Sequence, residues 1–222
     1  MAQKGSHGVF SEQTILARIV WIVLLLLAAG ALVTARWSLA FVSLATLLLS
    51  MTPLLLARWA QVRVPPSFIA AIVLFVAGTL FLGEVLDFYN RFWWWDIAMH
   101  GGSAVGFGLI GFVLVFMMFQ GDRFAAPPIA VAFFAFCFAL AMGALWEVFE
   151  FGMDQLFGLN MQKSGLLDTM GDLVVDSLGA LFGAGSGYVY LKWQAMAGPM
   201  SVIDEFVRRN PHLFRRHRKK DD

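Results

Sequence analysis

Apolar residues fall into long runs that short polar segments separate along the whole chain. A helix that crosses a bilayer needs about 20 mostly apolar residues. Six runs reach this length, so the pattern predicts an all-α fold, a bundle of six transmembrane helices at residues 14–34, 37–57, 67–86, 93–119, 129–153 and 166–191. The first two runs are joined so closely that they predict an antiparallel hairpin.

The composition supports a polytopic membrane protein. Hydrophobic residues make up 59% of the 222 residues and charged residues 14%, against about 45–50% and about 25% in soluble domains. This excludes a soluble globular domain. The first run lacks a small-residue cleavage site and is too long for a signal peptide, so we expect it to be retained. The single cysteine, Cys137, allows no intramolecular disulfide.

The basic residues predict the orientation, because cytoplasmic loops are enriched in Lys and Arg. Placing both termini in the cytoplasm puts 13 of the 16 Lys and Arg residues inside and leaves only Arg36, Arg91 and Lys163 outside. We therefore expect a multi-pass protein of the bacterial inner membrane, with a polar N-terminus (1–13), a transmembrane domain (14–192) and a basic tail (193–222). The tail is typical of a cytoplasmic interfacial segment that binds anionic lipid, not of a nucleic-acid partner.

Acidic residues collect at one end of the predicted bundle. Nine of the 15 acids lie at the predicted outer ends of four helices: Glu84, Asp87, Asp96, Glu147, Glu150, Asp154, Asp168, Asp172 and Asp176. Steps of three and four place the last six on one stripe of their helices. The helical rise of about 1.5 Å per residue predicts a shallow layer (Asp96, Asp154, Asp168), an intermediate layer (His100, Glu150, Asp172) and a deep layer (Glu147, Asp176).

So many carboxylates in a membrane are costly unless cations or protons compensate them. A divalent metal (Mg, Mn, Ca, Fe or Zn) is the economical solution, with ligands drawn from Asp96, His100, Glu147, Glu150, Asp154, Asp168, Asp172 and Asp176. Acids at helix ends also favour the helix dipole, which is a sufficient explanation for the shallow ones. Whether Glu84 and Asp87 belong to the site stays open.

Small residues at steps of four accompany the acids. Gly102 and Gly106, and Gly179, Gly183 and Gly187, form small-xxx-small patterns. These patterns let transmembrane helices approach closely. We therefore expect both sets of glycines to lie at helix contacts.

Three segments resemble the YjdF-like bacterial inner-membrane proteins, a poorly characterised family. They are WWWDIAMHGGS, WEVFEFGMD and DTMGDLVVDSLG, and the resemblance covers roughly residues 70–192. It implies that Asp96, His100, Glu147, Glu150, Asp154, Asp168, Asp172 and Asp176 occupy the family's motif positions. It implies no particular activity.

Three functions fit this pattern. The leading hypothesis is a metal-dependent hydrolase or transferase that acts on a lipid or isoprenoid-linked substrate from an acidic pocket in the outer leaflet. In it, His100 and Glu147 are the candidate catalytic acid–base groups. The first alternative is a divalent-cation or proton transporter, since intramembrane carboxylates also mark ion pathways. The second is a non-catalytic scaffold with a structural metal site.

Overall fold

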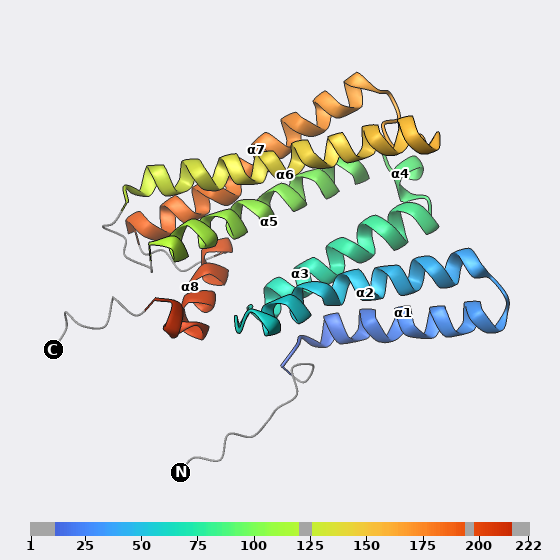
Figure 1. The fold of residues 1–222 in the computed structure, drawn as a ribbon, viewed down its shortest axis with the longest axis horizontal. Coiled ribbons are helices and arrows are strands. Elements are labelled where there is room, and N and C mark those ends of the chain that lie inside the picture. The colour runs from blue at the N-terminus through green and yellow to red at the C-terminus, as the bar shows by residue number, and fades with distance from the viewer. Residues whose placement is uncertain (1–11, 120–125, 194–197, 215–222) are drawn as a thin grey trace, which may run out of the picture. The chain divides into compact units, whose positions relative to one another are not determined.

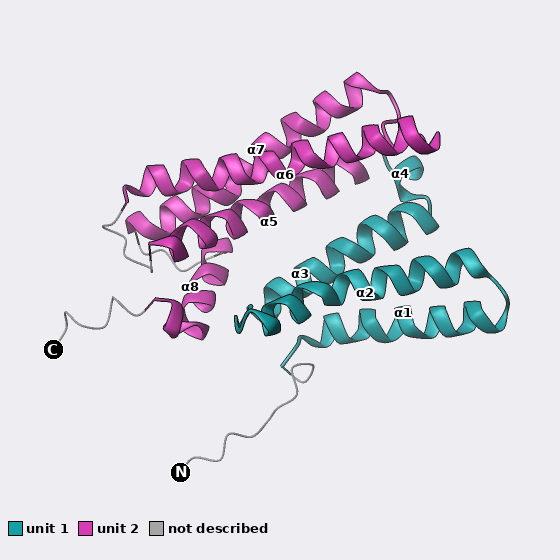
Figure 2. Cartoon of the chain, viewed as in Figure 1, with its two compact units in different colours: residues 1–92 teal, residues 93–222 magenta. Residues whose placement is uncertain are grey.

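The structure is a computed structural model of the chain, and it describes residues 12–119, 126–193 and 198–214. All regular structure in these residues is helical. The chain divides into two compact units, residues 1–92 and 93–222 (Figure 2). Most of the predicted N-terminal segment 1–13, the loop containing Arg123 and the basic residues from Arg215 onward lie outside the described residues.

Unit 1 begins with a helical hairpin, as the short connection predicts. The hairpin pairs α1 (Ile15–Val33) with α2 (Trp37–Trp59). Thr14 caps α1, because its side-chain oxygen accepts a hydrogen bond from the amide of Ala17 at 3.2 Å. In the middle of the hairpin the indole Nε1 of Trp21 donates to Ser50 Oγ at 3.1 Å, so the polar atoms of these two buried residues satisfy each other.

The third apolar run forms two helical types in succession. The α-helix α3 (Pro66–Val76) starts with proline in its first turn, as expected, and continues as the π-helix η1 (Ala77–Val85). Ile69 and Val73 of α3 are buried in a hydrophobic cluster with Ala17 and Trp21 of α1. The short helix α4 (Phe88–Arg91) follows. Unit 1 is therefore a small helical bundle with its own core.

Unit 2 contains three long helices that pack on one another in alternating directions (Figure 1). They are α5 (Trp95–Met118), α6 (Pro128–Phe157) and α7 (Leu166–Trp193). The start of α5, the end of α6 and the start of α7 consequently share one end of the bundle. The helix α6 runs one turn past its predicted end at residue 153, so Asp154 is helical.

Glycines bring α5 and α7 into backbone contact. A Cβ atom added at Gly183 would lie 2.5 Å from the carbonyl oxygen of Val105, and one at Gly179 would lie 2.7 Å from that of Gly101. Real Cβ atoms essentially never come so close, so only glycine fits at these two positions. The expectation for Gly102 and Gly106 is wrong, because a Cβ there would meet nothing within 4 Å.

The described part of the tail packs on unit 2. Helix α8 (Pro199–Arg209) buries Ile203 and Phe206, and the Phe214 ring stacks on Phe116 of α5 with centroids 5.6 Å apart. Two of its basic residues are paired within the helix: Arg208 Nε lies 3.1 Å from Asp204 Oδ2, and Arg209 Nε lies 2.8 Å from Glu205 Oε1. The apolar side of α8 is thus used inside the protein.

Five of the described helical segments are long and apolar enough to cross a membrane. They are Ile15–Val33, Trp37–Trp59, Pro66–Val85, Trp95–Met118 and Pro128–Phe157. Helix α7 is long enough but is not among them. Its aspartates and many glycines lower its hydropathy, and most of these residues are buried against neighbouring helices. The protein is therefore an all-α polytopic membrane protein with five candidate spans.

Candidate metal centre

A histidine from α5 lies at the centre of the acidic end of unit 2. His100 is buried, with 7% of its surface exposed, and faces carboxylates from all three long helices. We call these five residues the His100 cluster: Asp96 and His100 of α5, Glu147 of α6, and Asp172 and Asp176 of α7. The cluster forms because these three helix ends share one end of the bundle.

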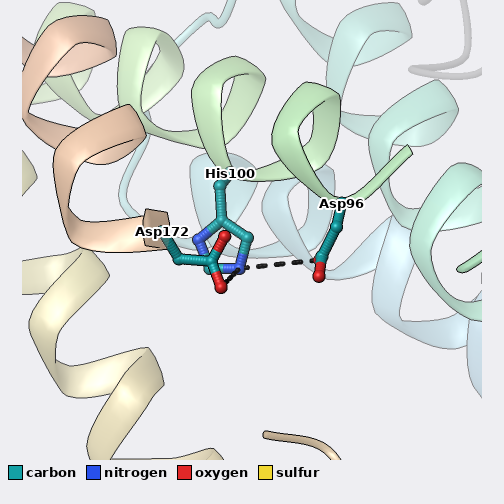
Figure 3. Close-up of side chains that lie close together, drawn as sticks. All are labelled: Asp96, His100 and Asp172. Atoms are coloured by element: carbon teal, nitrogen blue, oxygen red, sulfur yellow. Dashed lines mark ion pairs between the residues drawn. The ribbon is translucent and has the colours of Figure 1, made fainter. Parts of the chain in front are cut away.

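Three of the carboxylates surround one ring nitrogen. His100 Nε2 lies 3.9 Å from Asp96 Oδ1, 3.9 Å from Glu147 Oε1 and 3.9 Å from Asp172 Oδ2. Figure 3 shows the carboxylates of Asp96 and Asp172 turned toward the imidazole. Ligand atoms of Asp96, His100 and Asp172 all lie within 4.8 Å of one another. Each contact is too long for a hydrogen bond, so these carboxylates surround Nε2 without bonding to it.

The other ring nitrogen faces a single carboxylate. His100 Nδ1 lies 3.4 Å from Asp176 Oδ1 and 3.5 Å from Asp176 Oδ2. Asp176 is only 1% exposed. The two edges of the imidazole therefore have different surroundings, with three carboxylates on one side and one on the other.

Glu147 has unusual surroundings for a buried carboxylate. It is 4% exposed, and the Thr169 side chain lies close enough to interact with it, but neither of its oxygens has a hydrogen bond of standard geometry among the described residues. Buried polar atoms in native proteins almost always have such a bond. Its Oε1 lies 3.9 Å from the same Nε2 atom that Asp96 and Asp172 face. A buried carboxylate with so few hydrogen-bond donors is well suited to hold a cation.

The remaining predicted ligands have other partners. Glu150 accepts a hydrogen bond from the indole Nε1 of Trp146 at 2.9 Å. Asp154 accepts from the backbone amides of Met161 at 2.7 Å and Gln162 at 2.9 Å, and Asp168 accepts from the amide of Lys163 at 3.1 Å. Asp154 and Asp168 thus fix the loop between α6 and α7, which begins and ends at Gly158 and Gly165 with positive φ angles.

This loop supplies a cation that contacts the cluster. Lys163 Nζ lies 3.7 Å from Asp96 Oδ2, and about a third of its side chain is exposed. Lys163 is one of the three basic residues that the sequence analysis places outside. The pair connects the loop to the carboxylate that also faces His100.

Gly143 is a contributor that sequence reasoning missed. A Cβ atom at Gly143 of α6 would collide with the carboxylate of Asp176. The available signal was its place one helical turn before Glu147, on the same helix face. The sequence placed it among other small residues and gave no reason to choose it.

The donor set fits a divalent cation. Metal–ligand bonds to histidine nitrogen and carboxylate oxygen are about 2.1 Å long, which separates neighbouring ligand atoms by about 3–3.5 Å. The 3.9 Å contacts around Nε2 are slightly wider than this, and the ligand atoms of Asp96, His100 and Asp172 lie within 4.8 Å of one another. A bound cation would also compensate the crowded carboxylates.

The fold and this cluster define a polytopic membrane protein with a histidine–carboxylate centre. Residues 15–193 match a family described as predicted membrane proteins (DUF2238), and the chain belongs to this family. It is 30% identical over 102 residues to an uncharacterized protein of Thermotoga maritima. That match covers 44% of this chain and 50% of the relative, so the chain spans about half the relative's length. No solved structure matches.

Proposed function

We propose that this protein binds a divalent metal ion through Asp96, His100, Glu147 and Asp172. The observation that carries the proposal is the meeting of three carboxylate oxygens, each 3.9 Å from His100 Nε2. They come from three different helices, so no local backbone geometry accounts for the arrangement. The second support is Glu147, whose buried oxygens lack hydrogen bonds of standard geometry among the described residues and whose Oε1 lies 3.9 Å from this nitrogen.

The types of ligand atom narrow the choice of metal ion. Mg²⁺ and Ca²⁺ are bound mainly by oxygen, whereas imidazole suits iron and zinc, and carboxylates suit manganese. One imidazole with three carboxylates therefore favours Mn²⁺, Fe²⁺ or Zn²⁺ within the wider set of divalent ions.

The metal would support hydrolysis or group transfer. A divalent ion with open coordination positions polarises a phosphoryl or carbonyl oxygen and lowers the pKa of a bound water. His100 is enclosed by carboxylates on both edges of its ring. This assigns it the role of ligand, and Glu147 is the stronger candidate for the catalytic base, through the carboxylate oxygen that does not bind the ion.

The membrane placement belongs to the same proposal. We infer that α7 is a sixth span, because its central polar residues Asp172, Asp176 and Ser186 are buried in the protein and need not meet lipid. Both termini are then cytoplasmic, by the distribution of Lys and Arg, and the His100 cluster lies in the outer leaflet. A lipid or isoprenoid-linked substrate could reach it sideways from the bilayer. The motifs around Asp96, Glu147 and Asp168 support a YjdF-like inner-membrane protein, and the basic tail is proposed to contact anionic lipid.

Transport of a divalent cation or protons is the second candidate. The excess of four carboxylates over one imidazole in the His100 cluster favours a cation as cargo. The residues below Asp176 favour an enzyme instead. Gly108 and Gly183 bring α5 and α7 so close that a Cβ at Gly108 would lie 2.9 Å from Gly183 Cα. This contact leaves little room for a polar pathway between those two helices.

Elemental mass spectrometry tests the metal site. We would compare protein purified without chelator with its Asp172→Asn variant, and use Asp204→Asn in α8 as the matched control. One metal ion per chain in the wild type and the control, but not in Asp172→Asn, would support the site. Absence of metal from all three would overturn it and favour a scaffold held together by protonated carboxylates.

A second experiment separates the two functions. The metal-loaded protein would be reconstituted in liposomes that contain a phosphate-ester lipid. Asp172-dependent cleavage or transfer of the headgroup supports the enzyme, whereas Asp172-dependent accumulation of the metal inside the liposomes supports the transporter.

A further inference from the structure

We propose that Asp176 is a positioning residue that orients His100, and that Gly143 provides the space it needs. This role differs from the ligand role that the sequence predicts for Asp176. The inference rests on the proposed metal site, since it says how the protein presents His100 Nε2 to the ion.

The first support is that the two nitrogens of the imidazole face different carboxylates. Asp176 places both oxygens at Nδ1, at 3.4 and 3.5 Å, whereas the other three carboxylates lie at Nε2. In the tautomer that carries hydrogen on Nδ1, this nitrogen donates to Asp176 and leaves the Nε2 lone pair free. The carboxylate thereby selects the tautomer that can bind a metal on the side of Asp96, Glu147 and Asp172.

The second support is the space around Asp176. Its carboxylate occupies the volume that a Cβ atom of residue 143 would fill. Only glycine at that position of α6 lets the side chain of Asp176 reach His100 in this orientation. Gly143 belongs to a different helix from Asp176, so the space for this carboxylate depends on the packing of α6 against α7.

The third support is burial. Asp176 is 1% exposed, its Oδ2 lies within hydrogen-bond distance of His100 Nδ1, and its Oδ1 has no hydrogen bond of standard geometry among the described residues. A carboxylate buried this deeply is stable only beside a donor or a cation. His100 Nδ1, 3.5 Å from Oδ2, is the donor that the structure provides. We therefore expect the long contact to shorten when an ion on Nε2 strengthens the Nδ1–H donor.

Metal titrations of purified protein distinguish this role from direct ligation. The probe is Mn²⁺, and the variants are Asp176→Asn, Asp176→Ala and Asp172→Asn. The Asn side chain can still accept from Nδ1–H through its amide oxygen, but it is a poor metal ligand. Loss of a hydrogen-bond partner behind a ligating histidine typically weakens metal affinity about 10- to 100-fold. We expect this loss for Asp176→Ala, a smaller loss for Asp176→Asn and no measurable binding for Asp172→Asn.

Gly143 gives an independent test. The Gly143→Ala variant should weaken Mn²⁺ binding about as much as Asp176→Ala, because the added methyl group displaces the carboxylate. In the double variant Gly143→Ala/Asp176→Ala, the loss of Mn²⁺ affinity should be no larger than in either single variant. Gly102→Ala is the matched control, since a Cβ at that position meets nothing within 4 Å. Size-exclusion chromatography in detergent checks that each variant is folded. If Asp176→Ala does not fold, the comparison of Asp176→Asn with Gly143→Ala tests the inference.

Pulsed EPR of Cu²⁺-loaded protein supplies a signature that a general structural role would not change. The modulation from the remote imidazole nitrogen reports the hydrogen bonding of Nδ1. It should change in Asp176→Ala and Gly143→Ala and stay the same in Gly102→Ala. Equal loss of binding in Asp176→Asn and Asp172→Asn would make Asp176 a ligand and overturn the inference. Absence of metal binding in the wild type would instead overturn the proposed function.

Discussion

Lys163 and Asp96 form an ion pair between the α6–α7 loop and the His100 cluster, with Nζ 3.7 Å from Oδ2. The other oxygen of Asp96 faces His100 Nε2. One carboxylate thus connects the loop cation to the proposed metal position. A metal ion and Lys163 would compete for the negative charge of Asp96.

Removal of this lysine charge should strengthen metal binding. A partly exposed ion pair is worth about 0.2–1 kcal/mol, so we expect Lys163→Met to raise Mn²⁺ affinity by a few fold in calorimetric titrations. Lys192→Met is the control, because Lys192 donates to Tyr188 near the far end of α7. Weaker binding in Lys163→Met would contradict the competition and indicate that Lys163 supports the bound state.

Asp154 should prove to be a loop anchor. Asp154→Ala removes the acceptor of two backbone hydrogen bonds, from Met161 and Gln162. Each orphaned amide costs about 1–3 kcal/mol where it is buried, so hydrogen–deuterium exchange should rise at residues 158–165. Metal stoichiometry should stay at the wild-type value. Loss of the metal together with ordinary exchange in the loop would return Asp154 to the ligand set.

The glycine contact between α5 and α7 should control stability. Gly183→Ala places a methyl group against the carbonyl oxygen of Val105, and overpacking of this kind typically costs about 1–3 kcal/mol. We expect a lower unfolding temperature in detergent. Gly185→Ala, in the same helix with nothing within 4 Å of its added Cβ, should leave it unchanged or slightly higher. Similar effects of both substitutions would contradict close packing at Gly183.

The packing of helix α8 on unit 2 should depend on its aromatic contacts. Phe206 is buried, with its ring centroid 6.2 Å from that of Phe214. Truncating a buried Phe to Ala typically costs about 3–5 kcal/mol. A loss of this size should detach so short a helix from unit 2, so Phe206→Ala should expose residues 198–214 to limited proteolysis. Metal binding should be retained, because α8 packs at the other end of α7. Protection equal to the wild type would contradict the packing of α8 on unit 2.

The sequence by itself determined the class of protein and most of its helices. Apolar runs of membrane length are a local property, so they predict spans without knowledge of the fold. The prolines at residues 66 and 128 mark helix starts for an equally local reason, since their fixed φ suits the first turn. The collection of acids at one end follows from alternating helix directions.

Only the tertiary structure decided which acids meet. Depth estimated from helical rise grouped His100 with Glu150 and Asp172, yet Glu147 is the α6 residue that faces His100, and Glu150 binds Trp146. Rise along an axis does not specify how each helix is rotated or how closely it packs. Those quantities depend on contacts between distant residues, such as Gly183 with Val105 and Gly143 with Asp176. The His100 cluster is therefore a product of helix packing, which no single helix encodes.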